Sequence, residues 1–501
     1  MTGNSSVQPK IELLHRQFID QILAEAFELL ERPGIKVQAP AALDLLASAG
    51  ARVDTTTEGG VARIPEALAR RALESVPQEF FLYDRAGNPA VHYGGDSVHF
   101  DPGSSCVYLL DPETLEHRPA QAADLVRLLQ VAEMLPQYAA QSTAMVCADV
   151  ASEIGDLYRL FLVLWYSDKP VVTGGFSAAG GRRMLELLAI EAGGGQQLRQ
   201  KPRAVFDVCP SPPLTWTEFA AQSMIDLARA GVPAEIISMP LAGAASPVTL
   251  AGSVVQHAAE CLSGITIHQL AAPGAPVVWG GAPAIFDMRT GNTPMGAVET
   301  AMLDIAYAQV GKHLGLPTHT YLVGGDAKIV DAQAGTESGM EAVLGALAGI
   351  NMISGAGMLN FLASMSIEKL VIDAETIGYA QRLLAGIQAR TPTLAIDMFA
   401  KLGHSGDFLK LKETRQLFRS EQYLPSAVID RESLHGWQEA GSLSAFDRAR
   451  DRVDELVAAY HRPDLPSALE REMCVFIEAE GRRVGMEQLP GIAEPAAAGP
   501  V

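Results

Sequence analysis

Residues 318–359 read THTYLVGGDAKIVDAQAGTESGMEAVLGALAGINMISGAGML. The segment from Thr318 to Val323 has the composition of a β-strand and ends at a Gly-Gly pair, which a polar loop follows. A small-residue helix and a second strand, Ile350 to Ser354, come next. This order predicts a βαβ unit, in which the loops after the strands share one face. We therefore expect the loop with Asp326 and Lys328 to border any active site; the alternative is an ordinary turn with solvated charges.

The same pattern recurs upstream of this unit. Eight segments of strand composition, most of them followed by a segment of helical periodicity, occur at 98–100, 141–146, 170–174, 203–208, 234–238, 276–280, 318–323 and 350–354. Eight consecutive βα units predict an α/β protein with a closed (β/α)8 TIM barrel, whose active site lies at the carboxyl ends of the strands. The open doubly wound sheet is the alternative, but no GxGxxG turn after a strand supports it.

The segments on either side of the barrel differ from it in pattern. Residues 1–96 mix helical and strand signals and predict an N-terminal α+β cap. Residues 97–365 form the predicted barrel core, and residues 366–501, which are mostly helical in pattern, form a C-terminal extension that we expect to cover the barrel.

Composition excludes several classes of function. The chain has 501 residues and a net charge of −20, so long-range attraction to nucleic acid or to an anionic membrane is not expected. The first residues lack the pattern of a secretory signal, and no apolar run reaches about 18 residues, so we expect a cytoplasmic protein that does not contact the membrane. The five cysteines are scattered and lack zinc-site spacing, so we predict neither disulfides nor a metal.

Aromatic and acidic residues gather at or near the carboxyl ends of the predicted strands. Electron-rich ring faces attract a quaternary ammonium group and nearby carboxylates balance its charge, so this composition favours a cation as ligand. A purely structural role is the alternative to ligand binding for each of these residues. Buried aromatics often belong to the core, an Asp and an Arg can pair in a loop, and a histidine can be a hydrogen-bonded core residue. The candidate residues are Phe100, Asp101, Phe206, Trp279, Asp287, Arg289, His319, Tyr321, Asp326 and Phe361.

The familiar catalytic motifs are missing from the sequence. It contains no Gly-x-Ser-x-Gly elbow, no His-Glu-x-x-His and no Walker loop, and no nucleophile with a base partner is evident. We therefore identify no catalytic residue and expect a reaction that depends on positioning.

Several stretches together resemble one family. They are GSSCVYLLDPETLEHRP from Gly103, KPVVTGG from Lys169, CPSPPL from Cys209, GAVETAMLDIAYAQVGKHLGLP from Gly296 and the stretch from Gly324 onward, with GHSGDFL from Gly403 in the C-terminal part. In this combination, across about nine-tenths of the chain, the sequence resembles the trimethylamine methyltransferase family of corrinoid-dependent methyltransferases. The resemblance implies a barrel that delivers the methyl group of a methylated amine to the Co(I) corrinoid of a separate carrier protein, with no cofactor bound tightly by this chain.

The resemblance also bears on the substrate. The founding trimethylamine enzymes carry pyrrolysine in the barrel, whereas this sequence contains only the twenty standard residues. It is therefore similar to the non-pyrrolysine branch, which implies a quaternary amine, glycine betaine first, as the donor. Proline betaine, carnitine and trimethylamine stay open as donors. So do two rival readings, a lyase or decarboxylase and a non-catalytic protein that binds quaternary amines.

Roles follow from this hypothesis. Carboxylate recognition is assigned to Arg289 or His319, and charge balance to Asp101 and Asp326. Besides the carrier protein, we expect a symmetric homo-oligomer, because large barrels usually self-associate. The ammonium cage is predicted to consist of Phe100, Trp279, Tyr321 and Phe361.

Overall fold

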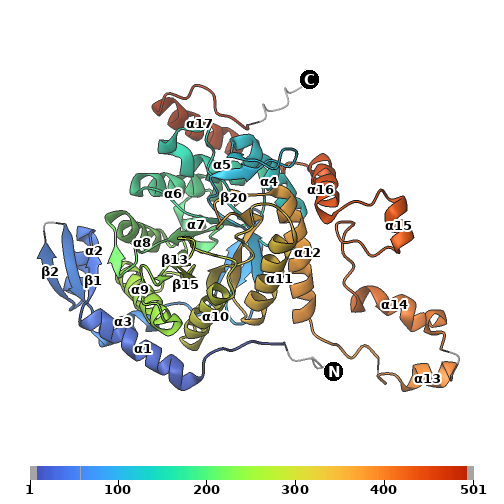
Figure 1. The fold of residues 1–501 in the computed structure, drawn as a ribbon. Helices are drawn as coiled ribbons and strands as arrows, with labels where there is room; N and C mark the ends of the chain where they lie inside the picture. The colour runs from blue at the N-terminus through green and yellow to red at the C-terminus, as the bar shows by residue number, and fades with distance from the viewer. Residues whose placement is uncertain (1–7, 57, 392, 405, 493–501) are drawn as a thin grey trace.

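The structure is a computed structural model that describes residues 8–492 apart from 57, 392 and 405. Its centre is a ring of parallel strands surrounded by helices (Figure 1). Each strand overlaps one of the eight predicted segments. The strands are β6 (His99–Pro102), β9 (Gln141–Ser142), β10 (Val171–Thr173), β11 (Ala204–Val208), β13 (Ala234–Ser238), β15 (Val277–Gly281), β17 (His319–Tyr321) and β18 (Met352–Ala356).

Two parallel sheets make up the ring, in the orders β15-β13-β11-β10-β9 and β17-β18-β6. A parallel bridge between Trp279 and Thr318 joins β15 to β17. On the other side the backbone N–H of Ala139 donates to the C=O of Phe100 at 2.9 Å, which brings β9 beside β6. The ring is therefore closed with the strands in chain order, and the predicted (β/α)8 barrel is confirmed.

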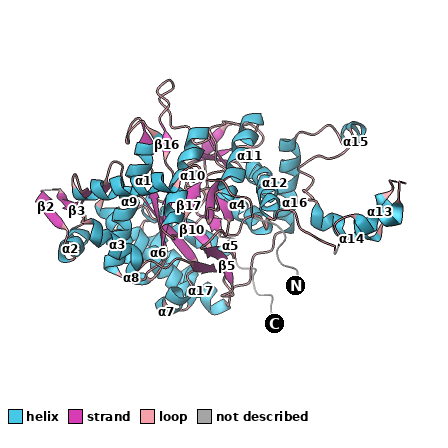
Figure 2. Ribbon diagram, turned by 90° about the horizontal axis from the view of Figure 1, so that it is seen from below, coloured by secondary structure: helices cyan, strands magenta, loops and turns pink. Residues whose placement is uncertain are grey.

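A helix follows each strand and lies outside the ring (Figure 2). Several begin at a side-chain N-cap: the Thr217 hydroxyl accepts from the Ala220 N–H and the Ser366 hydroxyl from the Lys369 N–H. The capped ends lie just after the strand-end loops, so the helices run antiparallel to the strands. They are α4 (Ala122–Met134), α5 (Gly155–Tyr166), α6 (Ala178–Ala192), α8 (Glu218–Ala230), α9 (Leu250–Ala271), α10 (Val298–His313), α11 (Ala332–Leu347) and α12 (Ile367–Leu384), with the short α7 (Gly195–Gln200) after α6.

Alternation along the strands separates the two faces of the barrel wall. In β11, Val205 belongs to an apolar cluster inside the barrel, and two residues further on Asp207 bonds to Tyr321 across the interior. The residue between them, Phe206, lies on the opposite face, because successive side chains of a strand point to opposite sides. The interior thus has an apolar floor and a polar layer above it. The floor consists of Leu82, Val91, Tyr93, Ala140, Val172, Val205, Val278 and Met352.

The N-terminal segment is α+β, as predicted. Its helices α1 (Arg16–Glu31), α2 (Pro40–Ser48) and α3 (Glu66–Glu74) pack against α9 on the side of the barrel. Strands β1 (Ile35–Val37), β2 (Arg52–Thr56) and β3 (Gly59–Arg63) form a sheet that β12 (Thr215–Trp216) extends. The hairpin β4 (Phe80–Tyr83) and β5 (Pro89–Tyr93) supplies part of the barrel floor, so this segment closes the end opposite the mouth.

Additional short strands lie in the loops that follow the barrel strands. One small sheet consists of β7 (Tyr108–Leu110), β8 (His117–Pro119), β19 (Met358–Leu359) and β20 (Ser364–Met365), and it ties the first βα unit to the last. The pair β14 (Leu241–Ala242) and β16 (Ala284–Ile285) joins two further loops, and the 3-10 turn η1 (Ser152–Ile154) precedes α5.

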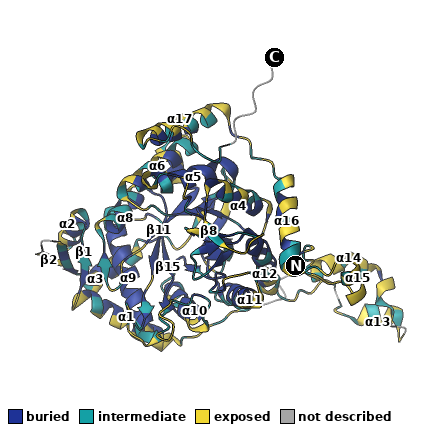
Figure 3. Cartoon of the chain, turned by 45° about the horizontal axis from the view of Figure 1, so that its top comes forward, coloured by how far each residue is buried: buried dark blue, intermediate teal, exposed yellow. Residues whose placement is uncertain are grey.

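The C-terminal segment only partly covers the barrel. Helix α16 (Ala445–Ala459) packs on α12 and α4, and α17 (Ser467–Arg483) packs on α6 and α5. Residues 386–443, which we call the arm, contain α13 (Ile396–Leu402), η2 (Phe408–Lys410), α14 (Lys412–Glu421) and α15 (Leu434–Glu439). The arm projects away from the body and is largely exposed (Figure 3).

The predicted boundary at residue 365 falls between β18 and α12. Because α12 packs against α11 and completes the eighth unit, we propose to extend the barrel core to Leu384. Within the described residues, no helix is both long and apolar enough to cross a membrane.

Candidate functional site

Three carboxyl groups lie in the polar layer of the barrel interior. Asp101 of β6 and Glu235 of β13 are fully buried, and Asp207 of β11 is largely so. Each accepts one short hydrogen bond from a hydroxyl group on another strand. The donors are Ser354 to Asp101 at 2.5 Å, Tyr321 to Asp207 at 2.6 Å and Tyr93 to Glu235 at 2.6 Å.

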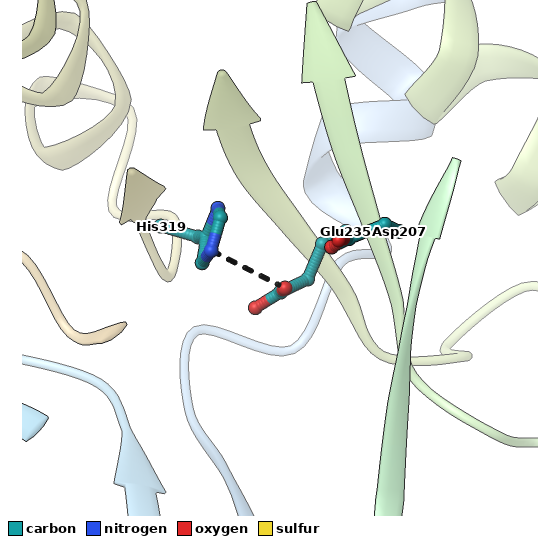
Figure 4. Close-up of side chains that lie close together, drawn as sticks. All are labelled: Asp207, Glu235 and His319. Atoms are coloured by element: carbon teal, nitrogen blue, oxygen red, sulfur yellow. Dashed lines mark ion pairs between the residues drawn. The ribbon is translucent and has the colours of Figure 1, made fainter. Parts of the chain in front are cut away.

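His319 belongs to the same layer. Its Nε2 lies 2.9 Å from the Ser354 hydroxyl and 3.8 Å from Glu235 Oε2 (Figure 4). Burial lowers the pKa of His319 to about 3, so the imidazole is neutral near pH 7. The contact between His319 and Glu235 is therefore not a pair of opposite charges at that pH.

Burial also changes the protonation of the acids. It raises the pKa of Asp101 and Glu235 well above the usual range and that of Asp207 to about 6. One carboxylate oxygen of Asp207 lies within 4.8 Å of one of Glu235, and the negative charge of Asp207 raises the pKa of Glu235 further. We infer that these two carboxyls share one proton, carried by Glu235, near neutral pH.

The cluster lacks a positive partner. Among the described residues, no Lys or Arg forms an ion pair with Asp101, Asp207 or Glu235. One oxygen of each carboxyl has no hydroxyl or N–H donor. Buried carboxyl groups are normally paired or coordinated, so the layer is suited to bind a cation that enters from the mouth.

The same side chains bear on metal binding. One ligand atom from each of Asp207, Glu235 and His319 lies within 4.8 Å of the others, a spacing that could hold a metal ion. His319 Nε2 would have to give up its bond to Ser354 to coordinate it. The residues fit an organic cation without that rearrangement, so we assign the layer to an organic cation and identify no metal ligand.

Three of the ten sequence-predicted residues lie in the polar layer, namely Asp101, His319 and Tyr321. Three predicted aromatics lie on the outer face of the wall instead, which corrects their assignment to the site. Phe206 and Phe100 each precede an inward acid and therefore face the surrounding helices. The Trp279 Nε1–H donates to the C=O of Tyr307 on α10 at 2.9 Å, so its ring is also outside.

The remaining predictions fall in loops. Arg289, with a side chain that is 89% exposed, pairs with Asp287 at 2.8 Å, so the structure does not support its assignment to a substrate carboxylate. Asp326 accepts from the backbone N–H of Met295 at 2.7 Å and shapes the loop after β17. Lys328 Nζ lies 3.8 Å from the centre of the Phe361 ring, so that face already carries a cation.

Sequence reasoning missed Tyr93, Glu235 and Ser354, and it selected Phe206 but not its neighbour Asp207. A signal for Glu235 was present, because it interrupts the apolar strand AEIIS and a central strand rarely buries a lone carboxylate. No signal marked Tyr93, which reaches the layer from the floor hairpin.

Comparisons with known proteins show the family to which the chain belongs. Residues 3–485 match the model of the family described as trimethylamine methyltransferase (MTTB). The chain is 34% identical to trimethylamine methyltransferase MttB1 of Methanosarcina mazei, over 90% of this chain and 91% of that protein. It is 29% identical to glycine betaine methyltransferase of Desulfitobacterium hafniense, over 96% and 99% of the two chains.

A solved structure supports the fold. The hydroxylamine complex of MtmB superposes with a TM-score of 0.50 at 13% identity, covering 88% of this chain and 94% of that chain. At this level of identity the likeness shows the fold alone.

Proposed function

From the premise that this chain belongs to the trimethylamine methyltransferase family and is a methyltransferase, we propose that it moves a methyl group from a quaternary amine to a corrinoid protein. Glycine betaine is the leading donor and the Co(I) corrinoid of a separate carrier protein is the acceptor. The observation that carries this proposal is the group of three buried carboxyls without a cation.

A quaternary ammonium suits this layer better than a metal or a protonated amine does. It keeps its charge at every pH and donates no N–H, so it needs diffuse negative charge and ring faces rather than fixed ligands. Asp207 and Glu235 provide the charge once their shared proton leaves, and Tyr321 provides a ring close to it. An ammonium group in the layer would stabilise the ionised acids and release that proton.

The chain then has to position the methyl group. In the transfer the carbon–nitrogen bond breaks, its electron pair stays on nitrogen, and the reduced cobalt of the carrier supplies the pair for the new bond. The nitrogen becomes neutral, so its attraction to the acids falls. Because their pKa values are raised, Glu235 and Asp207 can then take a proton back, which favours release of the product.

The closed floor of the barrel supports an approach of the carrier protein from the mouth. The hairpin of β4 and β5 fills the floor, so cobalt can approach an ammonium group in the polar layer only from the carboxyl ends of the strands. We therefore assign the mouth to the corrinoid protein, which brings its own cofactor, and place the reaction in the cytoplasm.

The arm is assigned to self-association. In α13, α14 and α15 no residue is buried, and large apolar side chains are exposed elsewhere in the arm too, among them Leu394 before α13 at 76% and Leu409 of η2 at 80%. Exposed apolar surface of this kind marks an interaction site. Helix α12 runs from the mouth toward the floor, so the arm leaves the barrel far from the surface assigned to the carrier.

The distribution of charge favours a second copy of this chain as the partner that binds the arm. Residues 386–443 contain seven Lys and Arg against seven Asp and Glu, so the rest of the chain holds the whole net charge of −20. Residues 401–419 contain five basic and two acidic residues. This basic stretch complements the acidic body of another copy, which fits a symmetric homo-oligomer.

The proposed reaction is tested with the purified protein, a reduced corrinoid carrier and a panel of donors. The panel is glycine betaine, proline betaine, carnitine, choline and trimethylamine, and the visible spectrum of the corrinoid reports methylation. We expect methylation with a quaternary donor and none with trimethylamine. Binding of a donor by calorimetry without methylation of the carrier would instead support the non-catalytic binding protein.

A further inference from the structure

A second buried charge lies at the barrel mouth. Arg159 of α5 is 1% exposed, and its Nη1 donates to the Ser105 hydroxyl at 3.0 Å and to the C=O of Thr143 at 2.8 Å. Ser105 follows β6 and Thr143 follows β9, so both acceptors stand at the carboxyl ends of adjacent strands. The guanidinium group is thus held at the rim of the mouth.

This guanidinium has no anionic partner. Among the described residues it forms no ion pair, and its Nε and Nη2 have no hydrogen-bond acceptor. Burial lowers its pKa to about 10, so it remains charged near neutral pH. Two other buried arginines behave differently, because Arg203 pairs with Glu191 and Arg85 with Asp168. Burying a guanidinium group without a counterion is energetically unfavourable. The two N–H groups that lack an acceptor lie on the same edge of the planar guanidinium.

The end of β6 connects this arginine to the acids. Asp101 lies in β6, and Ser105, whose hydroxyl accepts from Arg159, follows the same strand. Among the described residues no ion pair joins Arg159 to Asp101, Asp207 or Glu235. Separate positive and negative sites within one mouth match a molecule that carries both charges.

We propose that Arg159 binds the carboxylate of a zwitterionic donor whose ammonium group lies against Asp207 and Glu235. The inference rests on the proposed function and names its substrate class, amino acid betaines rather than choline-like cations. The Nε–H and Nη2–H groups of Arg159 are a pair of parallel donors, and a carboxylate can accept one hydrogen bond from each of them. Phe176 lies over the guanidinium at 4.5 Å and is 52% exposed, so its ring covers that face of the group.

Two substitutions test this assignment in the full-length protein. Arg159→Met removes the charge at similar length, and Arg159→Lys keeps the charge without the fork. By calorimetry we expect Arg159→Met to weaken glycine betaine binding by about 100-fold and choline binding by less than about threefold, with Arg159→Lys in between. Unliganded Arg159→Met should melt at or above the wild-type temperature, because an unpaired buried charge is gone.

The outcomes separate this inference from the proposed function. If Arg159→Met weakens betaine and choline equally, or lowers the unliganded melting temperature while the ratio of the two affinities is unchanged, Arg159 is structural and the inference is overturned. If the wild type prefers choline, the zwitterionic class is wrong although methyl transfer stands. If no donor methylates the carrier, the proposed function fails, and the change in betaine affinity still decides the role of Arg159.

Discussion

The barrel interior and the arm depart from the usual distribution of side chains in opposite directions. The interior buries carboxyl groups and an arginine without counterions, whereas the arm exposes large apolar side chains. Both arrangements are unfavourable in an isolated chain. The closed ring of strands is rigid enough to hold unpaired charges, while α13 to α15 have no core of their own to hide Leu394 or Leu409. We propose that a small charged ligand completes the interior and that another protein surface covers the arm.

The largest effect is expected in the interior. Asp207→Asn removes the acid with the most accessible charge, so kcat/KM for methyl transfer should fall by about 100-fold or more. The matched control is Asp304→Asn, which alters a fully buried acid that lies on α10 outside the wall. Its kcat/KM should change less than about threefold, and equal losses in the two variants would contradict the role of the polar layer.

The arm provides the second test of the comparison. The double substitution Phe399→Glu and Leu409→Glu places charge on exposed apolar positions, so the dissociation constant for self-association should rise by about 100-fold, as light scattering across a dilution series would show. Val475→Glu is the control, because Val475 is 59% exposed on α17 outside the arm. An unchanged assembly in the double variant would exclude the arm as its interface.

A dependence on pH should distinguish the interior from the arm. Asp207 has a pKa of about 6, so a quaternary amine should bind up to about tenfold more tightly per pH unit from pH 5 toward 7, and the proton that binding releases from Glu235 should extend the rise above pH 7. The stability of the unliganded protein should change with pH in the opposite direction. A raised pKa means that the folded state binds the proton more tightly than the unfolded state, so this contribution to stability is greatest below pH 4 and is lost as pH rises through 6. Calorimetry and denaturant titrations check both trends, and Asp207→Asn should flatten them.

Trp279 tests whether the outer face of the wall is separate from the site. Trp279→Phe leaves the C=O of Tyr307 without its donor and opens a gap beside α10, so the free energy of unfolding should fall by about 1–3 kcal/mol. The KM for the donor should stay unchanged. A raised KM for the donor at an unchanged free energy of unfolding would instead support the assignment of the Trp279 indole to the ammonium cage.

The smallest effect is expected at Arg289. Arg289→Ala removes an exposed side chain paired with Asp287, so stability should stay close to that of the wild type and the KM for glycine betaine should change by less than twofold. A large rise in KM for glycine betaine but not for choline would restore Arg289 as the carboxylate ligand in place of Arg159.

Much of the architecture could be predicted from the sequence because it depends on local periodicity. Each of the eight strand segments is short and apolar, and the helices after them repeat the same order, so the barrel and its catalytic face follow from pattern rules. The same rules brought Asp101, His319 and Tyr321 to the interior, since they stand at the ends of strands whose carboxyl ends meet.

The tertiary structure alone decided which face each side chain occupies and which distant groups meet. Phe206 and Asp207 are neighbours that must face opposite sides, and only the packing of α6 and α8 outside the wall places the ring there and the acid inside. Arg159 and Tyr93 come from a helix and a floor hairpin, far along the chain from the acids they approach. Their positions depend on closure of the ring, a long-range property that no local pattern encodes.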